Sequence, residues 1–338
     1  MIKQVPIEDF LNRPEKTPIL DARSEGEYFQ GHLPGALSFP ILNNEERALV
    51  GTCYKQKGHQ QAVILGYELV GPKFKDYIKY AYKNFEVGPI YVHCWRGGLR
   101  SQIMGNLLSS AGFQVHLLKG GYKSFRTLVL DYLAKEFEFK VLGGFTGCNK
   151  TFILRDLKEQ GAQVLDLEDL ANHRGSAFGN IGLPAQVTQE QFENDIYEEL
   201  VKMDYSKPIW VEDESRLIGK FQIPIKIHEA IRRCVVYFLD YSFEKRCENI
   251  LNLYGKLNKE ELVLSTEKIK KKLGDLRTRE AVQYLQEGNL EEWVKIVLAY
   301  YDQLYKFGVE KRDPSKIIKL EFTGEELLDY LGNLGLPK

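Results

Sequence analysis

Short apolar runs alternate with amphipathic segments along the 338 residues. Runs such as TPILDA (17–22), GPIYVHC (88–94) and PIWVEDE (208–214) have the length and apolar content of buried strands. Further strands are expected at 114–121 (ending in a glycine turn), 139–144, 162–167, 234–240 and 316–322, and helices at 100–111, 122–137, 151–160 and 243–254. Because strands alternate with helices, the pattern predicts α/β units built on parallel sheets.

The length suggests two domains at roughly 150 residues each. We expect an N-terminal domain at residues 1–126, a linker helix at 127–137 and a second α/β domain at 138–338. Residues 258–310 are almost wholly helical in pattern, so the second domain is expected to carry a helical insertion there.

Composition narrows the classes of protein. Apolar residues make up 43% and charged residues 28%, which excludes a disordered or fibrous chain. The net charge of −1 predicts no polyanion partner, so any nucleic-acid surface must be a local patch. The five cysteines form no CxxC pair, which argues against a disulfide framework or a zinc ribbon. With no apolar signal region and no membrane-length apolar run, we expect a cytoplasmic protein, and we expect a monomer.

The first candidate for chemistry is Cys94, at the end of a predicted strand in the sequence HCWRGGLRSQ. Backbone N–H groups of a short loop that leads into a helix can bind an anion, and two glycines let the backbone curl around it. That field, with Arg96 and Arg100, is expected to lower the pKa of the thiol and make Cys94 a nucleophilic thiolate, for which we expect a solvent-accessible side chain. The anion loop is expected to comprise Trp95, Arg96, Gly97, Gly98, Leu99 and Ser101. The alternative, a buried structural cysteine, holds for Cys53, Cys234 and Cys247.

The second candidate is GFTGCNKT (144–151), which matches the phosphate-loop pattern G-x-x-x-x-G-K-[ST] except at one position. Asn149 stands where the last glycine belongs, and asparagine tolerates a left-handed backbone better than most residues. The loop is therefore expected to survive, while nucleotide hydrolysis is in doubt. The expected diphosphate-binding residues are Gly144, Thr146, Gly147, Asn149, Lys150 and Thr151.

Acidic and basic residues elsewhere complete this second site. Three acids at the end of an apolar strand are candidate metal or water ligands or acid–base groups: Glu212, Asp213 and Glu214. No tightly bound cofactor is expected, but Mg²⁺ could face Thr151. Three further residues are candidates for contacts to diphosphate or tRNA: His173, Arg174 and Arg216. The alternatives are loop scaffolding and ion pairs between these acids and arginines.

The segments around Cys94 resemble the rhodanese family. DARSEGEYFQGHLPGA (21–36) is similar to the first rhodanese signature and LKGGY (118–122) to the later turn. Cysteine phosphatases share the Cys-x₅-Arg loop length, but no evident general acid for a phosphate ester is present. The charged residues of the first signature are expected to hold loops in place rather than to react: Asp21, Arg23, Glu27 and His32.

Three more segments extend the resemblance across nearly the whole chain: CWRGGLRS (94–101), ANHRGSAFG (171–179) and VEDESRLIG (211–219). Together they resemble the tRNA 2-selenouridine synthase family. The resemblance implies a rhodanese-like parallel-sheet domain followed by a P-loop NTPase-like α/β domain with a helical C-terminal appendage. It also implies that a wobble 2-thiouridine in the tRNA anticodon loop is alkylated by geranyl diphosphate. Selenium from selenophosphate then displaces the geranylthio group, with Cys94 carrying selenium as a selanylsulfide.

A tRNA substrate needs a surface on this nearly neutral chain. The basic segment KIKKKLGDLRTR (268–279) is the candidate, with Lys270, Lys271, Lys272 and Arg277 as contacts and a solvated helix face as the alternative. Trp95 could stack on a splayed base or pack in the core. The alternative functions are a rhodanese-type sulfurtransferase, a cysteine phosphatase-like enzyme with a degenerate phosphate loop, and a non-catalytic tRNA-binding protein.

Overall fold

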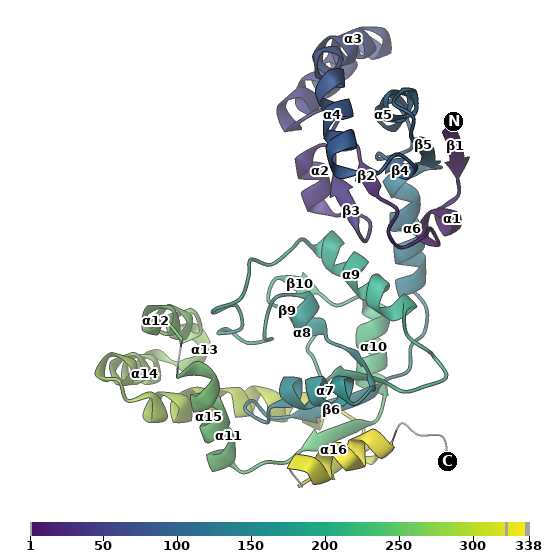
Figure 1. The fold of residues 1–338 in the computed structure, drawn as a ribbon. Coiled ribbons are helices and arrows are strands. Elements are labelled where there is room, and N and C mark those ends of the chain that lie inside the picture. The colour runs from purple at the N-terminus through teal and green to yellow at the C-terminus, as the bar shows by residue number, and fades with distance from the viewer. Residues whose placement is uncertain (1, 256, 322–323, 335–338) are drawn as a thin grey trace. The chain divides into compact units, whose positions relative to one another are not determined.

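A five-stranded parallel sheet forms the centre of the first half of the chain in the computed structural model, which describes residues 2–255, 257–321 and 324–334 (Figure 1). Its order is β1 (Ile2–Val5), β5 (Gln114–Leu118), β4 (Pro89–His93), β2 (Ile19–Asp21) and β3 (Ala36–Ser38). Of the three inner strands, β4 and β2 are largely buried and were predicted from their apolar runs. The edge strands β1 and β3 were missed because three or four partly exposed residues carry too little pattern.

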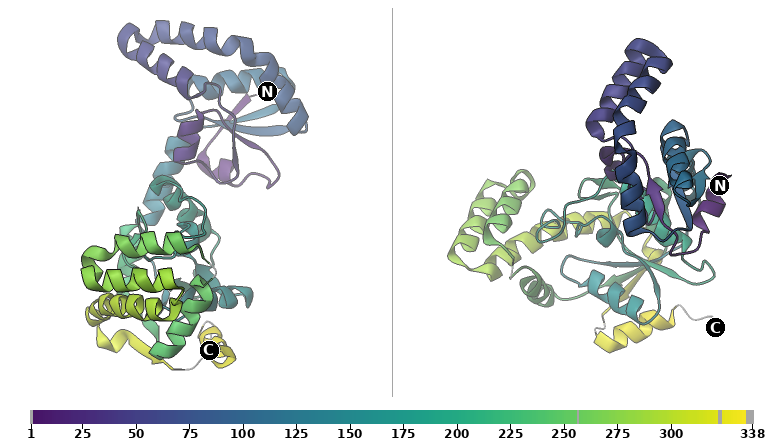
Figure 2. Two further views of the ribbon diagram at one scale, coloured as in Figure 1. Left: turned by 90° about the vertical axis from the view of Figure 1, so that its left-hand side faces the viewer. Right: turned by 45° about the horizontal axis from the view of Figure 1, so that its top comes forward.

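The helices of this half include one long element that the sequence did not predict. They are α1 (Ile7–Leu11), α2 (Glu25–Gln30), α3 (Asn44–Val70), α4 (Phe74–Asn84), α5 (Leu99–Ser110) and α6 (Gly121–Leu133), with a 3₁₀ turn, η1 (Gly71–Lys73). Gly58 has a left-handed φ of 83° and breaks α3 into two arms, visible in purple in Figure 2. Met104 and Leu108 of α5 belong to the same hydrophobic core as Val115 of β5.

A second parallel sheet organises the other half. Its order is β12 (Ile317–Leu320), β11 (Val236–Leu239), β6 (Lys140–Gly144), β8 (Ile209–Glu212) and β7 (Gln163–Leu165). A separate antiparallel pair joins β9 (Leu217–Ile218) and β10 (Phe221–Gln222). Ligands of open parallel sheets bind outside the carboxyl ends of the strands, so the loops after β6, β7 and β8 are where a site is expected.

The helices of the second half fall into two groups. Those that accompany the sheet are α7 (Lys150–Glu159), α8 (Leu167–Leu170), α9 (Gln189–Val201), α10 (Ile225–Arg233), α11 (Phe243–Tyr254) and α16 (Gly324–Asn333). The second group is α12 (Lys259–Lys268), α13 (Lys270–Leu273), α14 (Asp275–Glu287) and α15 (Leu290–Glu310), drawn in green in Figure 2. Trp293 and Leu285 of this group belong to a hydrophobic core that also contains Tyr254 of α11. The predicted α/β fold with a helical C-terminal appendage is confirmed.

The chain divides into two compact units, Met1–Tyr132 and Leu133–Lys338. The division falls at the end of α6, inside the segment 127–137 that the sequence assigns to a linker helix. That helix ends at Leu133, four residues earlier than the pattern indicates. Among the described residues, no helix has both the length and the apolar character needed to cross a bilayer.

Candidate functional site

The Cys94 loop connects the buried end of β4 to the first turn of α5. The Sγ atom of Cys94 lies 3.1 Å from the hydroxyl oxygen of Ser101 and 3.8 Å from the carbonyl oxygen of Gly98. Ser101 is fully buried, so its hydroxyl is fixed beside the sulfur. These contacts make the cysteine part of the loop's own structure and hold its side chain in one place.

Two glycines let the loop pack against the turn that follows β5. Gly97 has φ 68°, and a Cβ there would lie 2.9 Å from the carbonyl oxygen of Leu118. Gly121 has φ 61°, and its Cβ would lie only 2.4 Å from the carbonyl oxygen of Cys94. Both positions therefore exclude a side chain on two grounds, the left-handed backbone and the close approach. The LKGGY turn thus shapes the cysteine loop directly.

The backbone of the cysteine loop offers unused donors. Within the described part of the chain, no backbone carbonyl accepts from the N–H groups of residues 95–101, whereas the carbonyls of Cys94 and Trp95 accept from Tyr122 and Lys123. A run of free N–H groups at the start of a helix is an anion-binding arrangement. The predicted anion loop is therefore geometrically available.

The expectation of an exposed thiol is wrong. Cys94 is 2% exposed, because the loop, Ser101 and the Gly121 turn close around its side chain. A reagent or donor consequently has to enter the loop to reach the sulfur. Trp95 is half-buried, with its ring 5.7 Å from that of Tyr122, and Arg96 is exposed. Trp95 thus contacts Tyr122 of its own unit and stays partly accessible.

Arg100 forms a two-pronged ion pair with Glu27 of α2. Its Nη2 donates to Oε1 of Glu27 at 3.1 Å, and its Nη1 donates to Oε2. Burial alone would raise the pKa of Glu27, but the hydrogen bonds and charge of Arg100 lower it. Behind this pair, Asp21 and Arg23 are completely buried and paired with each other. The charged residues of 21–36 thus lie in the scaffold, and Arg100 ties the end of the cysteine loop to it.

The second loop runs from β6 into α7 and has the backbone shape of a phosphate loop. Asn149 adopts φ 57° and ψ 31°, the left-handed conformation that its glycine-replacing position requires. Gly147 has φ 89°, and a Cβ there would lie 2.7 Å from the carbonyl oxygen of Arg246. Lys150 is 9% exposed, and its Nζ donates to the carbonyl oxygen of Gly144 at 3.2 Å. The lysine therefore folds back over the loop.

Neighbouring groups keep the side chain of Lys150 protonated. Burial alone would lower its pKa, but attraction to Tyr305, Glu212, Cys148 and Glu214 raises it above its ordinary value. The ammonium group stays protonated and is available to an anionic ligand. Its neighbour Thr151 donates its hydroxyl to Glu212 at 2.7 Å.

Three carboxylates converge on Thr151. The ligand oxygens of Glu168, Glu212 and Glu214 all lie within 4.8 Å of one another, and the Thr151 hydroxyl also reaches Glu168 at 3.3 Å. Burial raises the pKa values of Glu168 and Glu214, and repulsion from Glu212 raises them further. Hard oxygen donors gathered in this way fit a divalent cation such as Mg²⁺, which would relieve their repulsion.

The carboxylate cluster contains Glu168, which was not predicted, and lacks Asp213, which was. Glu168 was missed because it follows β7, and only the pairing of β7 with β8 brings it beside Glu212. The signal that could have found it is the repeated presence of acids after neighbouring parallel strands. Asp213 points elsewhere, since it pairs with Arg232 at 3.2 Å and with Arg312.

A cavity of about 780 Å³ connects the phosphate loop to this acidic cluster. Its walls include Thr146 and Gly147 of the loop, Arg174 and Gly175 of the ANHRGSAFG segment, and apolar or aromatic residues such as Leu253. A Cβ at Gly175 would lie 2.6 Å from a carboxylate oxygen of Glu168, so this glycine lets the segment close over the acids. Cationic, anionic and apolar walls thus meet in one space.

The remaining predicted residues of the second unit take different positions. Arg174 lines the cavity and donates to the carbonyl oxygen of Ile181 at 3.0 Å. His173 is buried behind the segment, and burial lowers its pKa. Arg216 is exposed and does not line the cavity. The structure therefore brings Arg174 to the loop and leaves His173 and Arg216 outside its walls.

The basic segment of the appendage lies at the surface. Lys270, Lys271 and Lys272 on α13 and Arg277 on α14 are all exposed. Lys270 forms an exposed ion pair with Asp275 at 3.3 Å, whereas Lys271, Lys272 and Arg277 form none within the described residues. An exposed pair of this kind contributes little to stability and leaves the lysines available to phosphates.

Comparison with known proteins matches both units. A protein-family model described as the tRNA 2-selenouridine synthase AAA domain matches residues 137–334, and one described as the rhodanese-like domain matches residues 7–128. Proteins named tRNA 2-selenouridine synthase are similar over nearly the full chain. The one from Pseudomonas savastanoi pv. phaseolicola is 37% identical and covers 95% of both chains. The one from Bdellovibrio bacteriovorus is 36% identical over 94% of this chain and 96% of its own. The one from Alcanivorax borkumensis is 35% identical over 90% and 91%.

Proposed function

The chain belongs to the tRNA 2-selenouridine synthase family, and on this premise we propose that it replaces sulfur by selenium in a tRNA 2-thiouridine in two steps. In the first step, the sulfur attacks C1 of geranyl diphosphate, a C–S bond forms, and diphosphate leaves. In the second step, selenium forms a bond to C2 of the base and the C2–S bond breaks. Geranylthiol then leaves and carries a proton.

The observation that carries this proposal is the presence of two loops whose geometry suits anions and whose chemistry differs. The loop at Cys94 has free N–H groups and a sulfur, and the loop at Lys150 has a cation, a hydroxyl and a large cavity. A diphosphate suits the second loop because leaving-group binding needs no nucleotide hydrolysis, so Asn149 is no obstacle. A selenophosphate suits the first loop because its size and charge are those of an oxyanion.

The second step conserves atoms and electrons when selenophosphate is the donor. S-geranyl-2-thiouridine, selenophosphate and one water give 2-selenouridine, geranylthiol and phosphate, with no external oxidant or reductant. We assign to Cys94 the holding of selenophosphate in its loop without an S–Se bond, because selenide-level selenium could form that bond only with an oxidant. The selenium attacks C2 and geranylthiol leaves; water then cleaves the Se–P bond and phosphate departs. The closed loop around Cys94 keeps the bound selenium from water until the base arrives.

Mg²⁺ fits the acidic cluster as an accessory group. Thr151, Glu168, Glu212 and Glu214 would hold it, and it would supply positive charge to a diphosphate leaving group. Lys150 supplies a second positive charge from the protein itself. Between them, these groups favour departure of a group that carries several negative charges.

The proposal is tested by nucleoside mass spectrometry on wild-type protein. A 2-thiouridine-containing tRNA is incubated first with geranyl diphosphate and then with selenophosphate. We expect S-geranyl-2-thiouridine after the first stage and 2-selenouridine after the second. Thiosulfate replaces selenophosphate in a parallel arm to test the sulfurtransferase alternative. Absence of an alkylated nucleoside, with sulfur transfer from thiosulfate to a small acceptor, would refute the two-step proposal.

A further inference from the structure

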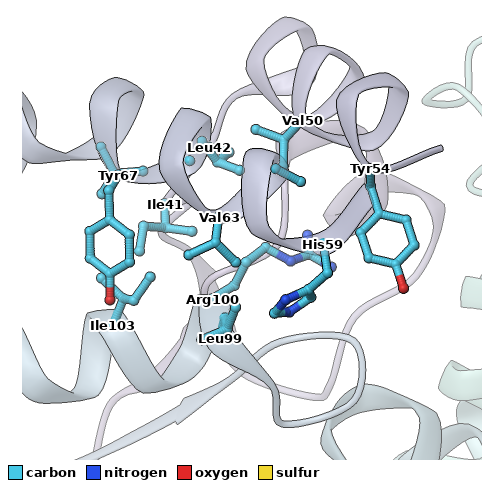
Figure 3. Close-up of a pocket in the computed structure, with 13 residues that line it drawn as sticks. Ile41, Leu42, Val50, Tyr54, His59, Val63, Tyr67, Leu99, Arg100 and Ile103 are labelled. Atoms are coloured by element: carbon cyan, nitrogen blue, oxygen red, sulfur yellow. The ribbon is translucent and has the colours of Figure 1, made fainter. Parts of the chain in front are cut away.

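The first unit contains an apolar cavity of about 220 Å³ that the proposed reaction leaves without a role. Figure 3 shows Val50 and Val63, one from each arm of α3, facing the first turn of α5 with Leu99 and Arg100. Ile41 and Leu42 of the loop before α3 close its floor. The break at Gly58 makes the cavity, because it folds the second arm back so that both arms contribute walls.

The cavity lies beside the reactive loop within the same unit. Leu99, Arg100 and Ile103 line it, and Leu99 and Ile103 are one helical turn apart on α5. The residue next to Arg100 is Ser101, whose hydroxyl lies 3.1 Å from the Cys94 sulfur. The first turn of α5 therefore separates an apolar space from the Cys94 thiol. The charge of Arg100 is already neutralised by Glu27, so the cavity has no free cation to attract a phosphate.

The lining and the size select a class of ligand. Walls of valine, leucine, isoleucine and alanine carry no hydrogen-bonding group, and polar atoms enter only through His59, the two tyrosines and Arg100. An apolar cavity of about 150 Å³ accepts benzene, so by carbon number about 220 Å³ corresponds to about nine carbons. Three exposed apolar side chains extend the surface at its rim, Tyr54, Tyr67 and Leu99. These side chains give an apolar chain a surface to lie on where it leaves the cavity.

We infer that this cavity binds the ten-carbon isoprenoid chain of the geranylthio group while selenium displaces it at the Cys94 loop. The inference rests on the proposed function and deepens it. The chain lies between the arms of α3, which holds the C2–S bond near the thiol loop. When the C2–Se bond forms and the C2–S bond breaks, the sulfur leaves with the chain as geranylthiol. Burial of the chain in the cavity favours binding of the alkylated nucleoside over unmodified 2-thiouridine, which has no isoprenoid chain.

Gly66 gives a sharp test of the inference. It lines the cavity, and a Cβ added there would meet no atom within 4 Å. We therefore expect Gly66→Leu to take up space in the cavity, since its Cβ meets no other atom, and to replace a helical glycine by a better helix former. Gly51→Leu is the matched control, because Gly51 lies on the same helix, also faces open space and does not line the cavity.

The assay isolates the second step. Full-length protein receives selenophosphate and an anticodon stem-loop RNA that already carries S-geranyl-2-thiouridine or the five-carbon S-dimethylallyl analogue. We expect Gly66→Leu to lower 2-selenouridine formation from the geranyl RNA about tenfold, the scale of methylene-level discrimination in apolar pockets. Gly66→Leu should form 2-selenouridine from the dimethylallyl RNA within about twofold of the wild-type rate. Gly51→Leu should change the rate with neither RNA.

The outcomes separate this inference from the proposed function. If wild-type protein converts neither alkylated RNA, the proposed function fails. If wild type converts the geranyl RNA and Gly66→Leu converts it equally well, the proposed function stands and the assignment of the cavity is overturned. Equal losses with both alkylated RNAs would also overturn it, since a filled cavity has to discriminate by chain length. Titration of geranylthiol alone into wild type and Gly66→Leu, followed by NMR shifts of the Val50 and Val63 methyls, gives a second readout.

Discussion

The backbone conformation of Asn149 decides whether this loop keeps the shape of a phosphate loop although its last glycine is missing. Its φ of 57° is a region that asparagine enters at modest cost and that a β-branched residue enters only with strain. The predicted match to the phosphate-loop pattern therefore holds in shape despite the missing glycine. A nucleotide-hydrolysing role is a separate matter, and a leaving-group role asks less of the loop.

Replacement of Asn149 tests this conformational argument. We expect Asn149→Val to weaken binding of inorganic diphosphate about tenfold, because a strained left-handed residue costs about 1–2 kcal/mol and about 1.4 kcal/mol corresponds to tenfold. Asn149→Gly is the control and should bind at least as tightly as wild type. Isothermal titration measures both. A valine variant with wild-type affinity would show that the loop does not need this backbone.

His93 makes a different residue-scale prediction, for stability against pH. It is fully buried at the end of β4, where its Nε2 lies 3.7 Å from a carboxylate oxygen of Asp21, and burial lowers its pKa to about 4. The unfolded chain takes up a proton near pH 6.5 and the folded unit does not until about pH 4. Stability is therefore complete above pH 6.5 and falls as the pH drops toward 4, by about 3 kcal/mol.

Hydrogen exchange of the β4 amides measures this loss. Wild-type protein should lose protection in β4 between pH 6.5 and 4, after correction for intrinsic exchange. His93→Phe keeps an aromatic ring in the same packing and removes the titrating group, so its protection should vary much less over that range. The same acid sensitivity in the variant would assign the effect to other groups.

At the scale of elements, the cysteine loop depends on the turn after β5 as much as on its own residues. Gly121→Ala should shift the loop, because the added Cβ would lie 2.4 Å from the Cys94 carbonyl oxygen. Gly112→Ala is the control, since Gly112 has a similar positive φ of 93° but its Cβ would only touch Val87 at 3.6 Å. We expect a loss of selenium transfer above tenfold for the first variant and below twofold for the second. Similar losses in both would show that backbone strain alone explains the effect.

Elements with a strong local pattern could be predicted from the sequence, and elements defined by long-range contacts could not. The strands β4 and β6 and their loops followed from buried apolar runs that end in glycine-rich motifs. Helix α3 was missed because its apolar positions do not form a continuous stripe, and only Ala62 and Val70 are fully buried. The cavity beside α5 depends on the fold of that helix, so it could not be foreseen either.

The same limit applies to the site. The candidates Cys94, Lys150, Thr151 and Glu212 came from motif and strand position. Glu168 was not, because the β7–β8 pairing rather than sequence distance brings it to the cluster. The exposure of Cys94 was predicted wrongly, since packing of the Gly121 turn on the loop has no signature in the loop itself.

At the scale of the whole molecule, a net charge of −1 has to be reconciled with a tRNA substrate. The local answer is the exposed basic segment around α13. Triple replacement of Lys270, Lys271 and Lys272 by Glu should lower the slope of log Kd against log salt for tRNA by about 2, because each lost phosphate contact removes about 0.7–0.9. Replacement of Lys75, Lys79 and Lys83 on α4 by Glu is the control. It changes the net charge equally at a different surface and should leave the slope nearly unchanged. Equal effects of the two triples would indicate bulk charge rather than a patch.

Division of the reaction between the two loops is the central claim, and one measurement tests it directly. Wild-type protein, Cys94→Ser and Lys150→Ala are each incubated with 2-thiouridine tRNA, geranyl diphosphate and selenophosphate, and the nucleosides are quantified by mass spectrometry. We predict that Cys94→Ser accumulates S-geranyl-2-thiouridine without 2-selenouridine, and that Lys150→Ala leaves the 2-thiouridine unalkylated. Formation of 2-selenouridine by Cys94→Ser at the wild-type rate, or normal alkylation by Lys150→Ala, would contradict the account.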